Sequence, residues 1–154
     1  MLLRAFLIAV LSAACPGAFA QQGQCDSSAF REAVATASVA ITRLQEKNGG
    51  TFQEKLQRLR TLNNWQEAEY VARATPFIRD ETTQALDAAN QALLAKVQSL
   101  DAASASTEAG RCAMLSDVKA AMEKVVANTG AKWEHMLDKV ARASAQPIRA
   151  GFNP

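Results

Sequence analysis

The helical spacing of apolar residues is the feature that most restricts how this chain can fold. From about residue 106 to residue 143, apolar side chains recur every three or four positions and stay within about 120° of one helix face. The residues of this stripe are Leu115, Val118, Met122, Val125, Val126, Thr129, Trp133, Met136, Leu137 and Val140. Nothing in the chain alternates with the two-residue period of a strand. The sequence therefore predicts an all-α protein whose longest helix is the last one.

Turn and cap residues divide the remainder of the chain into shorter segments. Gly49-Gly50 is expected to end a first helix over 26–48, since glycine is common just past a helix C-terminus. Asn63-Asn64 lies where the apolar stripe changes phase, which favours a break or kink. Thr75-Pro76 is expected to begin another helix that continues to about residue 100. We therefore expect a small bundle of four to five helical segments.

The first twenty residues have the pattern of a cleavable export signal. Arg4 is followed by an apolar run over 5–14, and the small residues Ala18 and Ala20 fit cleavage before Gln21. A membrane-spanning helix needs about 20 apolar residues, so this run is too short to remain as an anchor. The sequence therefore predicts that the protein is exported and is periplasmic or secreted.

A second interpretation of the same region is a bacterial lipoprotein signal. Leu11–Cys15 loosely resembles the motif in which the cysteine is lipidated and becomes the first residue of the mature chain. Ser12 stands where an aliphatic residue is usual, and Pro16 follows the cysteine directly. A lipid anchor through Cys15 is for these reasons the less favoured alternative.

The domain organisation that follows has three parts. A signal peptide covers 1–20, a helical domain covers 21–143 with a small polar linker over 101–107, and a flexible tail covers 144–154. Removing the signal leaves 134 residues with 16 basic and 15 acidic side chains, a net charge of +1. Nucleic acid binding needs a basic face, and binding to an anionic membrane needs a basic segment, so neither is expected. No later segment is apolar enough to cross a membrane.

Two cysteines remain after cleavage, and they constrain the topology. Cys25 and Cys112 form an even pair in an exported chain, which predicts a disulfide closing a loop of about 87 residues. In four alternating antiparallel helices these cysteines would lie about 30 Å apart, beyond the reach of a disulfide. A reversal at Asn63-Asn64 would bring them to the same end, so a bridge within one chain favours five segments over four. A bridge between two chains would remove this constraint.

Residues with catalytic, metal-binding or cofactor-binding chemistry are sparse. His135 is the only histidine, and it points about 140° away from the apolar stripe of its own helix. We expect it to face solvent or a partner, so that replacing it with alanine changes stability by less than about 0.5 kcal/mol. A haem held by this histidine and a methionine is disfavoured, and the chain has too few ligands for a structural zinc. We assign no catalytic residue, metal or cofactor.

Two groups of residues are candidates for partner binding. Trp65 and Tyr70, beside the predicted break, could line a groove or simply fill the corner where helices cross. Lys55, Arg58 and Arg60 form a basic cluster that could meet an acidic partner or remain a solvated face.

The function predicted from these observations is binding rather than catalysis. We expect a non-enzymatic, periplasmic helical interaction protein, such as an envelope accessory factor, a chaperone-like binder or a secretion-system component. Its partner would be another envelope protein. The alternative is a small exported helical enzyme, or a ligand or haem carrier, with a pocket between helices. A cavity lined by several convergent charged side chains would favour this alternative, whereas a solid alanine-rich core would favour the interaction protein.

Overall fold

A computed structural model describes residues 25–100 and 106–146, which form four helices. They are α1 (Ser27–Leu62), α2 (Glu67–Ile78), α3 (Glu81–Gln98) and α4 (Glu108–Ala145). The all-α prediction and the long C-terminal helix are confirmed. The expected signal peptide, most of the linker and residues 147–154 of the expected tail lie outside the described residues.

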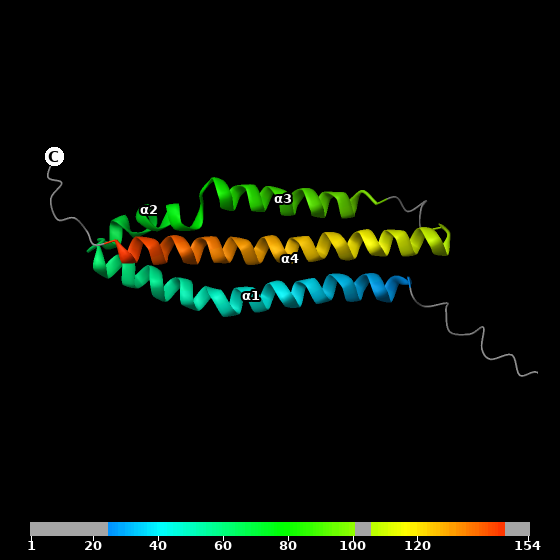
Figure 1. Cartoon of the computed structure of the whole chain (residues 1–154), viewed down its shortest axis with the longest axis horizontal. Helices are drawn as coiled ribbons and strands as arrows, with labels where there is room; N and C mark the ends of the chain where they lie inside the picture. Colours follow the sequence, from blue (N-terminus) through cyan, green and yellow to red (C-terminus); the bar gives the residue numbers. More distant parts are fainter. Residues whose placement is uncertain (1–24, 101–105, 147–154) are drawn as a thin grey trace, which may run out of the picture.

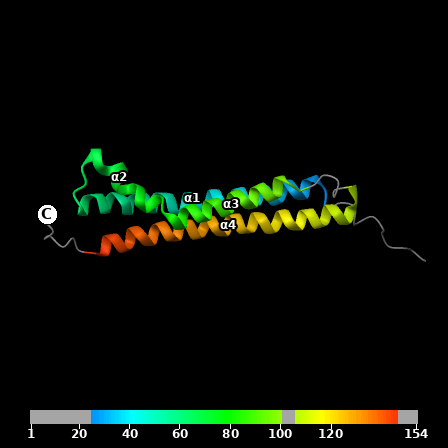
Figure 2. The same cartoon turned by 90° about the horizontal axis from the view of Figure 1, so that it is seen from above.

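The helices form three rows, with α4 between α1 on one side and α2 and α3 on the other (Figure 1). The chain runs along the bundle through α1, returns through α2 and α3 in succession, and reverses again into α4. Helices α1 and α4 therefore run parallel, and α3 runs antiparallel to α4 (Figures 1 and 2). Both α1 and α3 pack along α4, whereas α2 touches α4 more sparingly.

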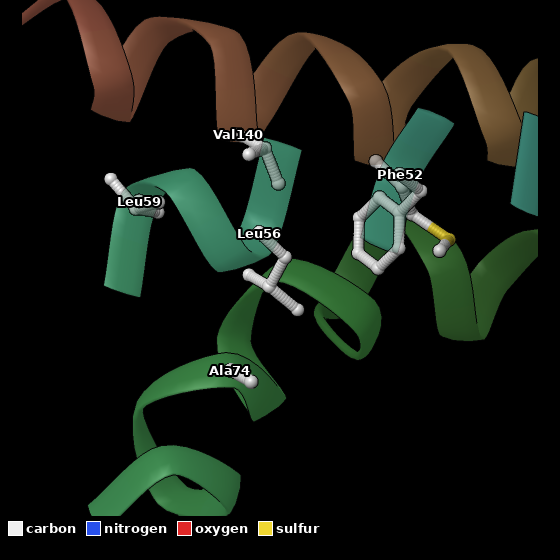
Figure 3. Close-up of a cluster of buried hydrophobic side chains, with 6 residues drawn as sticks. Phe52, Leu56, Leu59, Ala74 and Val140 are labelled. Carbon is white, nitrogen blue, oxygen red and sulfur yellow. The ribbon is translucent and has the colours of Figure 1, made fainter. Parts of the chain in front are cut away.

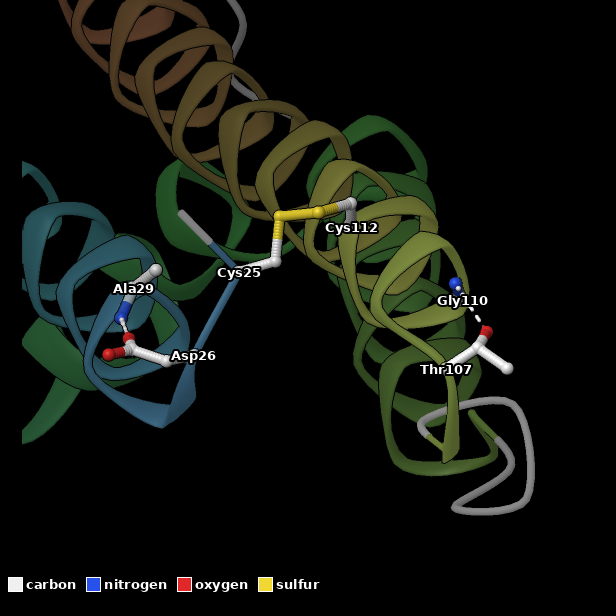
Figure 4. The surroundings of a disulfide bond; sticks show 6 residues. All are labelled: Cys25, Asp26, Ala29, Thr107, Gly110 and Cys112. Carbon is white, nitrogen blue, oxygen red and sulfur yellow. Dashed lines mark hydrogen bonds between the residues drawn. A yellow bond between two sulfur atoms is a disulfide. The ribbon is translucent and has the colours of Figure 1, made fainter. Parts of the chain in front are cut away.

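The disulfide joins the start of α1 to the first turns of α4 (Figure 4). The Cα atoms of Cys25 and Cys112 lie 5.0 Å apart within one chain. The expected reversal after Asn63 is present, and it brings both cysteines to the same end. The sequence favoured five segments to allow this disulfide, but four helices are enough. The chain reverses neither at Gly49-Gly50 nor at Thr75-Pro76.

The predicted helix end at Gly49-Gly50 is wrong. Helix α1 is 36 residues long and continues through both glycines. Phe52, Leu56 and Leu59, in the second half of α1, are buried against α4 and α2. Burying each of these side chains contributes about 1.5–3 kcal/mol. Each helical glycine costs about 1 kcal/mol relative to alanine. The burial outweighs the glycine cost, so the helix bows in its second half without breaking (Figure 1).

The predicted helix start at Thr75-Pro76 is also wrong, because Pro76 lies inside α2. Phe77, the next residue, packs against the core cluster around Phe52, which carries the helix on for two residues beyond the proline. The actual break follows at Arg79, and Asp80 starts α3 as its N-cap. Asp80 and Thr83 form a reciprocal capping box, with both hydrogen bonds at 2.9 Å.

Two apolar clusters hold the helices together. The larger one lies at the α2 end of the bundle and joins α1, α2 and α4 (Figure 3). Its buried members are Phe52, Leu56, Leu59, Ala74, Met136 and Val140. The second cluster lies nearer the disulfide and has as its buried members Ala37, Val118 and Met122. Val140 belongs to α4, which continues to Ala145, so Ser144 and Ala145 are helical and not part of a loose tail.

Among the described residues, no helix is both long enough and apolar enough to cross a membrane.

Candidate functional site

A groove of about 590 Å³ runs between α1 and α4, and its lining is mostly apolar and small. From α1 it is lined by Ala29, Glu32, Ala33, Thr36, Ala37 and Ala40, and from α4 by Lys119, Met122, Glu123, Val126 and Ala127. Four alanines on this face of α1 leave the space that larger side chains would fill. The groove is thus a direct consequence of the alanine-rich composition of α1.

The groove continues toward the disulfide. A second hollow, lined by Cys25, Cys112 and neighbouring residues of α4, shares Lys119 and Glu123 with the first. The first groove covers the stretch of α1 from Ala29 to Ala40, or about 16 Å at 1.5 Å per residue, and the second hollow extends it along α4 to Cys112. The length of the first groove matches about three turns of a docked helix.

The two walls of the groove keep a constant register. Cys25 pairs with Cys112, a separation of 87 residues. Further along, a Cβ atom placed on Gly130 would lie 3.9 Å from the side chain of Leu44, 86 residues earlier in the chain. A residue of α1 is therefore level with the residue of α4 about 86–87 positions later.

The charged residues of the groove do not form a catalytic set. Glu32, Lys119 and Glu123 are all exposed, so they form its rim while its floor stays apolar. Across the described residues, no group of three or more His, Cys, Asp and Glu side chains could hold a metal ion.

On its other side, α4 meets α3 through a ladder of polar pairs. Nδ2 of Asn128 donates a hydrogen bond to Oδ1 of Asn90 at 2.9 Å. One turn further along α4, Nζ of Lys132 lies 2.7 Å from both carboxylate oxygens of Asp87. These contacts fix the antiparallel register of α3 against α4.

Asp80 ends this ladder at the joint between α2 and α3. Its Oδ2 atom lies 2.7 Å from Nε2 of His135 and 2.5 Å from Nζ of Lys139. Lys139 also donates a hydrogen bond to the backbone carbonyl of Pro76 in α2. The hydrogen bond from His135, then those from Lys139 and the backbone N–H of Thr83, hold the pKa of Asp80 well below its usual value. The Asp80 carboxylate thus ties the start of α3 to α4, and Lys139 joins α2 to this site through the carbonyl of Pro76.

The expectation that His135 faces solvent or a partner is wrong. Its side chain is partly buried, at 25% exposure, and it contacts Asp80 of the same chain. The helix phase was inferred correctly, since His135 points away from the apolar stripe, but α3 lies on that side of α4. Sequence analysis missed the ladder because its residues are polar. The signal was the helical spacing of polar residues on α4, at Asn128, Lys132, His135 and Lys139.

Trp65 and Tyr70 are placed at the corner between α1 and α2. Both are partly buried and pack against the larger apolar cluster, and Trp65 lies 6.2 Å from Phe77 between ring centroids. Arg60 reaches across this corner, with its guanidinium 5.1 Å from the centroid of the Tyr70 ring and 2.5 Å from the carboxylate of Glu67. Trp65, Tyr70 and Arg60 therefore pack together at the corner between α1 and α2, and partner binding by these residues stays a prediction.

Lys55 and Arg58 differ from Arg60 in their surroundings. Both are exposed on α1, one turn apart, whereas the side chain of Arg60 is only 27% exposed. The basic cluster predicted from sequence is thus divided between two surface residues and one residue that braces the corner.

Comparison with protein-family models, curated proteins and solved structures finds no match to this chain.

Proposed function

We propose that this protein is a non-enzymatic, exported helical interaction protein that docks a partner along the groove between α1 and α4. The observation that carries the proposal is the lining of the groove, in which small and mostly apolar residues of α1, from Ala29 to Ala40, form one wall about 16 Å long. Small residues let two helix backbones approach closely, and a groove of this shape is a common way to receive an amphipathic helix. Export is supported by the signal-like N-terminus and by the Cys25–Cys112 disulfide.

The role in the cell is proposed on the same basis. An envelope accessory factor, a chaperone-like binder or a secretion-system component each needs a rigid scaffold and a surface for another envelope protein. The disulfide and the polar ladder between α3 and α4 supply the rigidity, while the groove supplies the surface.

Capture from the native envelope with one variant inside the groove and one outside it tests this proposal. Thr36 is exposed and lines the groove, so Thr36→Arg fills it without removing a core side chain. Lys124→Glu is the matched surface control, because Lys124 is exposed on α4 and is not among the residues that line the groove. Proteins retained by the wild type and by Lys124→Glu, but lost with Thr36→Arg, are the expected result. Equal retention by the wild type and both variants argues against the groove.

A carrier of a small apolar ligand is the second candidate. The volume of about 590 Å³ falls within the range of roughly 300–1,000 Å³ that is typical of small-molecule pockets. A fatty acid or sterol found by mass spectrometry in protein purified from the envelope, and displaced in Thr36→Arg, would favour this candidate over a docked protein.

A further inference from the structure

We propose that the occupant of the α1–α4 groove is a second copy of this chain, docked face to face and antiparallel. This inference rests on the proposed function, and it names the partner of the same surface. Three observations carry it: the spacing of the small residues on α1, the charges on α4, and the register between the two helices.

The residues of α1 that line the groove are spaced symmetrically about a point between residues 34 and 35. They are Ala29, Glu32, Ala33, Thr36, Ala37 and Ala40. Two such helices laid antiparallel on each other place Ala29 over Ala40, Ala33 over Thr36 and Glu32 over Ala37. Except for Glu32, these side chains are small enough to allow an interaxial distance near the lower end of the usual 8–10 Å.

The charges on α4 are self-complementary about one point. Lys119 and Glu123 are the charged residues that α4 contributes to the groove, and they are symmetric about residue 121. In an antiparallel pair centred there, Lys119 of each copy meets Glu123 of the other. The interface then contains two ion pairs between Lys119 and Glu123, while Glu32 of α1, the third charged residue of the groove, lies over Ala37 of the other copy.

The two centres lie at the same level along the bundle. Residues of α1 are level with residues of α4 that come 86–87 positions later, as the Cys25–Cys112 and Leu44–Gly130 contacts give. A point between residues 34 and 35 is therefore level with α4 at about residue 121, within one turn of the helix. One two-fold axis at right angles to both helices satisfies the symmetry of α1 and of α4 simultaneously. A two-fold interface requires such a self-complementary patch.

Charge reversal and its rescue test the dimer. The mass of the purified, disulfide-bonded protein is measured by light scattering and sedimentation over a range of concentrations. We expect a dimer that Lys119→Glu weakens by about ten-fold or more, because two attractive contacts become repulsive. The double variant Lys119→Glu/Glu123→Lys is expected to restore the affinity, since the pairs are re-formed with their signs exchanged. Lys124→Glu, outside the groove on the same helix, should dimerise like the wild type.

Steric blocking gives a second, independent readout. Thr36→Arg places a long side chain at the centre of the interface and is expected to produce a monomer with an unchanged helical circular dichroism spectrum. A wild-type protein that is monomeric at millimolar concentration overturns the inference, as does a dimer that Lys119→Glu and Thr36→Arg leave intact. If the wild type is monomeric while capture from the envelope still depends on Thr36, the groove binds a different protein. In that case the proposed function stands and the dimer fails.

Discussion

Asp80 of α3 and His135 of α4 are joined by a hydrogen bond of 2.7 Å between Oδ2 and Nε2. A carboxylate only accepts hydrogen bonds, so Nε2 of His135 carries the proton in this contact. The bond links the N-cap of α3 to the central helix, at the point where α2 and α3 meet. The joint between the two shorter helices is therefore fixed by side chains on α4.

Replacing His135 tests this joint. We expect His135→Ala to lower the free energy of unfolding by about 1 kcal/mol, the usual net value of a hydrogen bond, because it removes one partner of Asp80. Urea denaturation followed by circular dichroism measures the change. Glu134→Ala, at the adjacent exposed position, is the control and should stay within about 0.5 kcal/mol of the wild type. Indistinguishable stabilities for the two variants would mean that the bond contributes nothing.

The depressed pKa of Asp80 predicts an acid-sensitive contribution to stability. Its pKa in the folded protein lies below the ordinary value of 3.8. The contribution of the ionised Asp80 to the free energy of unfolding is therefore fully present above about pH 5. It is lost as the pH falls through 3.8 toward the pKa of Asp80 in the folded protein. Asp80→Asn keeps a residue that caps helices well but removes the charge. We expect the melting temperature of this variant to fall less steeply between pH 5 and pH 2 than that of the wild type. Glu81→Gln, at an exposed neighbouring carboxylate, should retain the wild-type slope.

Removing the disulfide should destabilise the bundle strongly. The bridge closes a loop with a separation of 87 residues, and its loss in Cys25→Ser/Cys112→Ser should cost about 2–5 kcal/mol. Guanidinium denaturation of the oxidised wild type and of the double variant gives this difference. Peptide mapping without reductant should find the two cysteines linked within a monomer. A bridge found only between chains would contradict the parallel arrangement of α1 and α4.

The glycines inside α1 offer a test of helix continuity. A Cβ atom on Gly50 would meet no other atom within 4 Å, and one on Gly49 would lie at an ordinary contact distance of 3.9 Å from Trp133. Gly50→Ala should therefore raise the free energy of unfolding by about 0.5–1 kcal/mol, since alanine is the better helix former. Gly49→Ala should act in the same direction. If α1 ended at this point with a left-handed glycine, either substitution would instead be destabilising.

Much of the fold could be predicted from residue spacing. The apolar stripe of α4 lies on one face without interruption, so its length followed directly from its period. The two cysteines gave the relative direction of α1 and α4, because a disulfide has a short reach. The errors at Gly49-Gly50 and Pro76 arose where local preference and tertiary packing disagree. Packing of Phe52 against Trp133 of α4, and of Phe77 against the larger apolar cluster, decided these two positions.

The candidate site was harder to predict because it belongs to a pair of helices. The alanines of α1 were visible in the sequence, but a groove exists only once α4 is known to be the neighbour. The same reason explains His135, whose direction on its own helix was correct and whose contact with α3 depended on the packing. A polar stripe at helical spacing, such as Asn128, Lys132 and Lys139, can mark an interface as well as a solvated face.

Site-specific photocrosslinking from Thr36 tests the docking groove most directly. A photoreactive amino acid is placed at Thr36 in the groove, and in a parallel sample at Lys124 outside it, and cells are irradiated before the envelope is isolated. We expect position 36 to give a crosslinked product of one discrete mass, and position 124 to give no such product. If the groove holds a second copy of this chain, that mass is the mass of two copies. Equal crosslinking from both positions, or no protein adduct from position 36, would contradict docking in the groove.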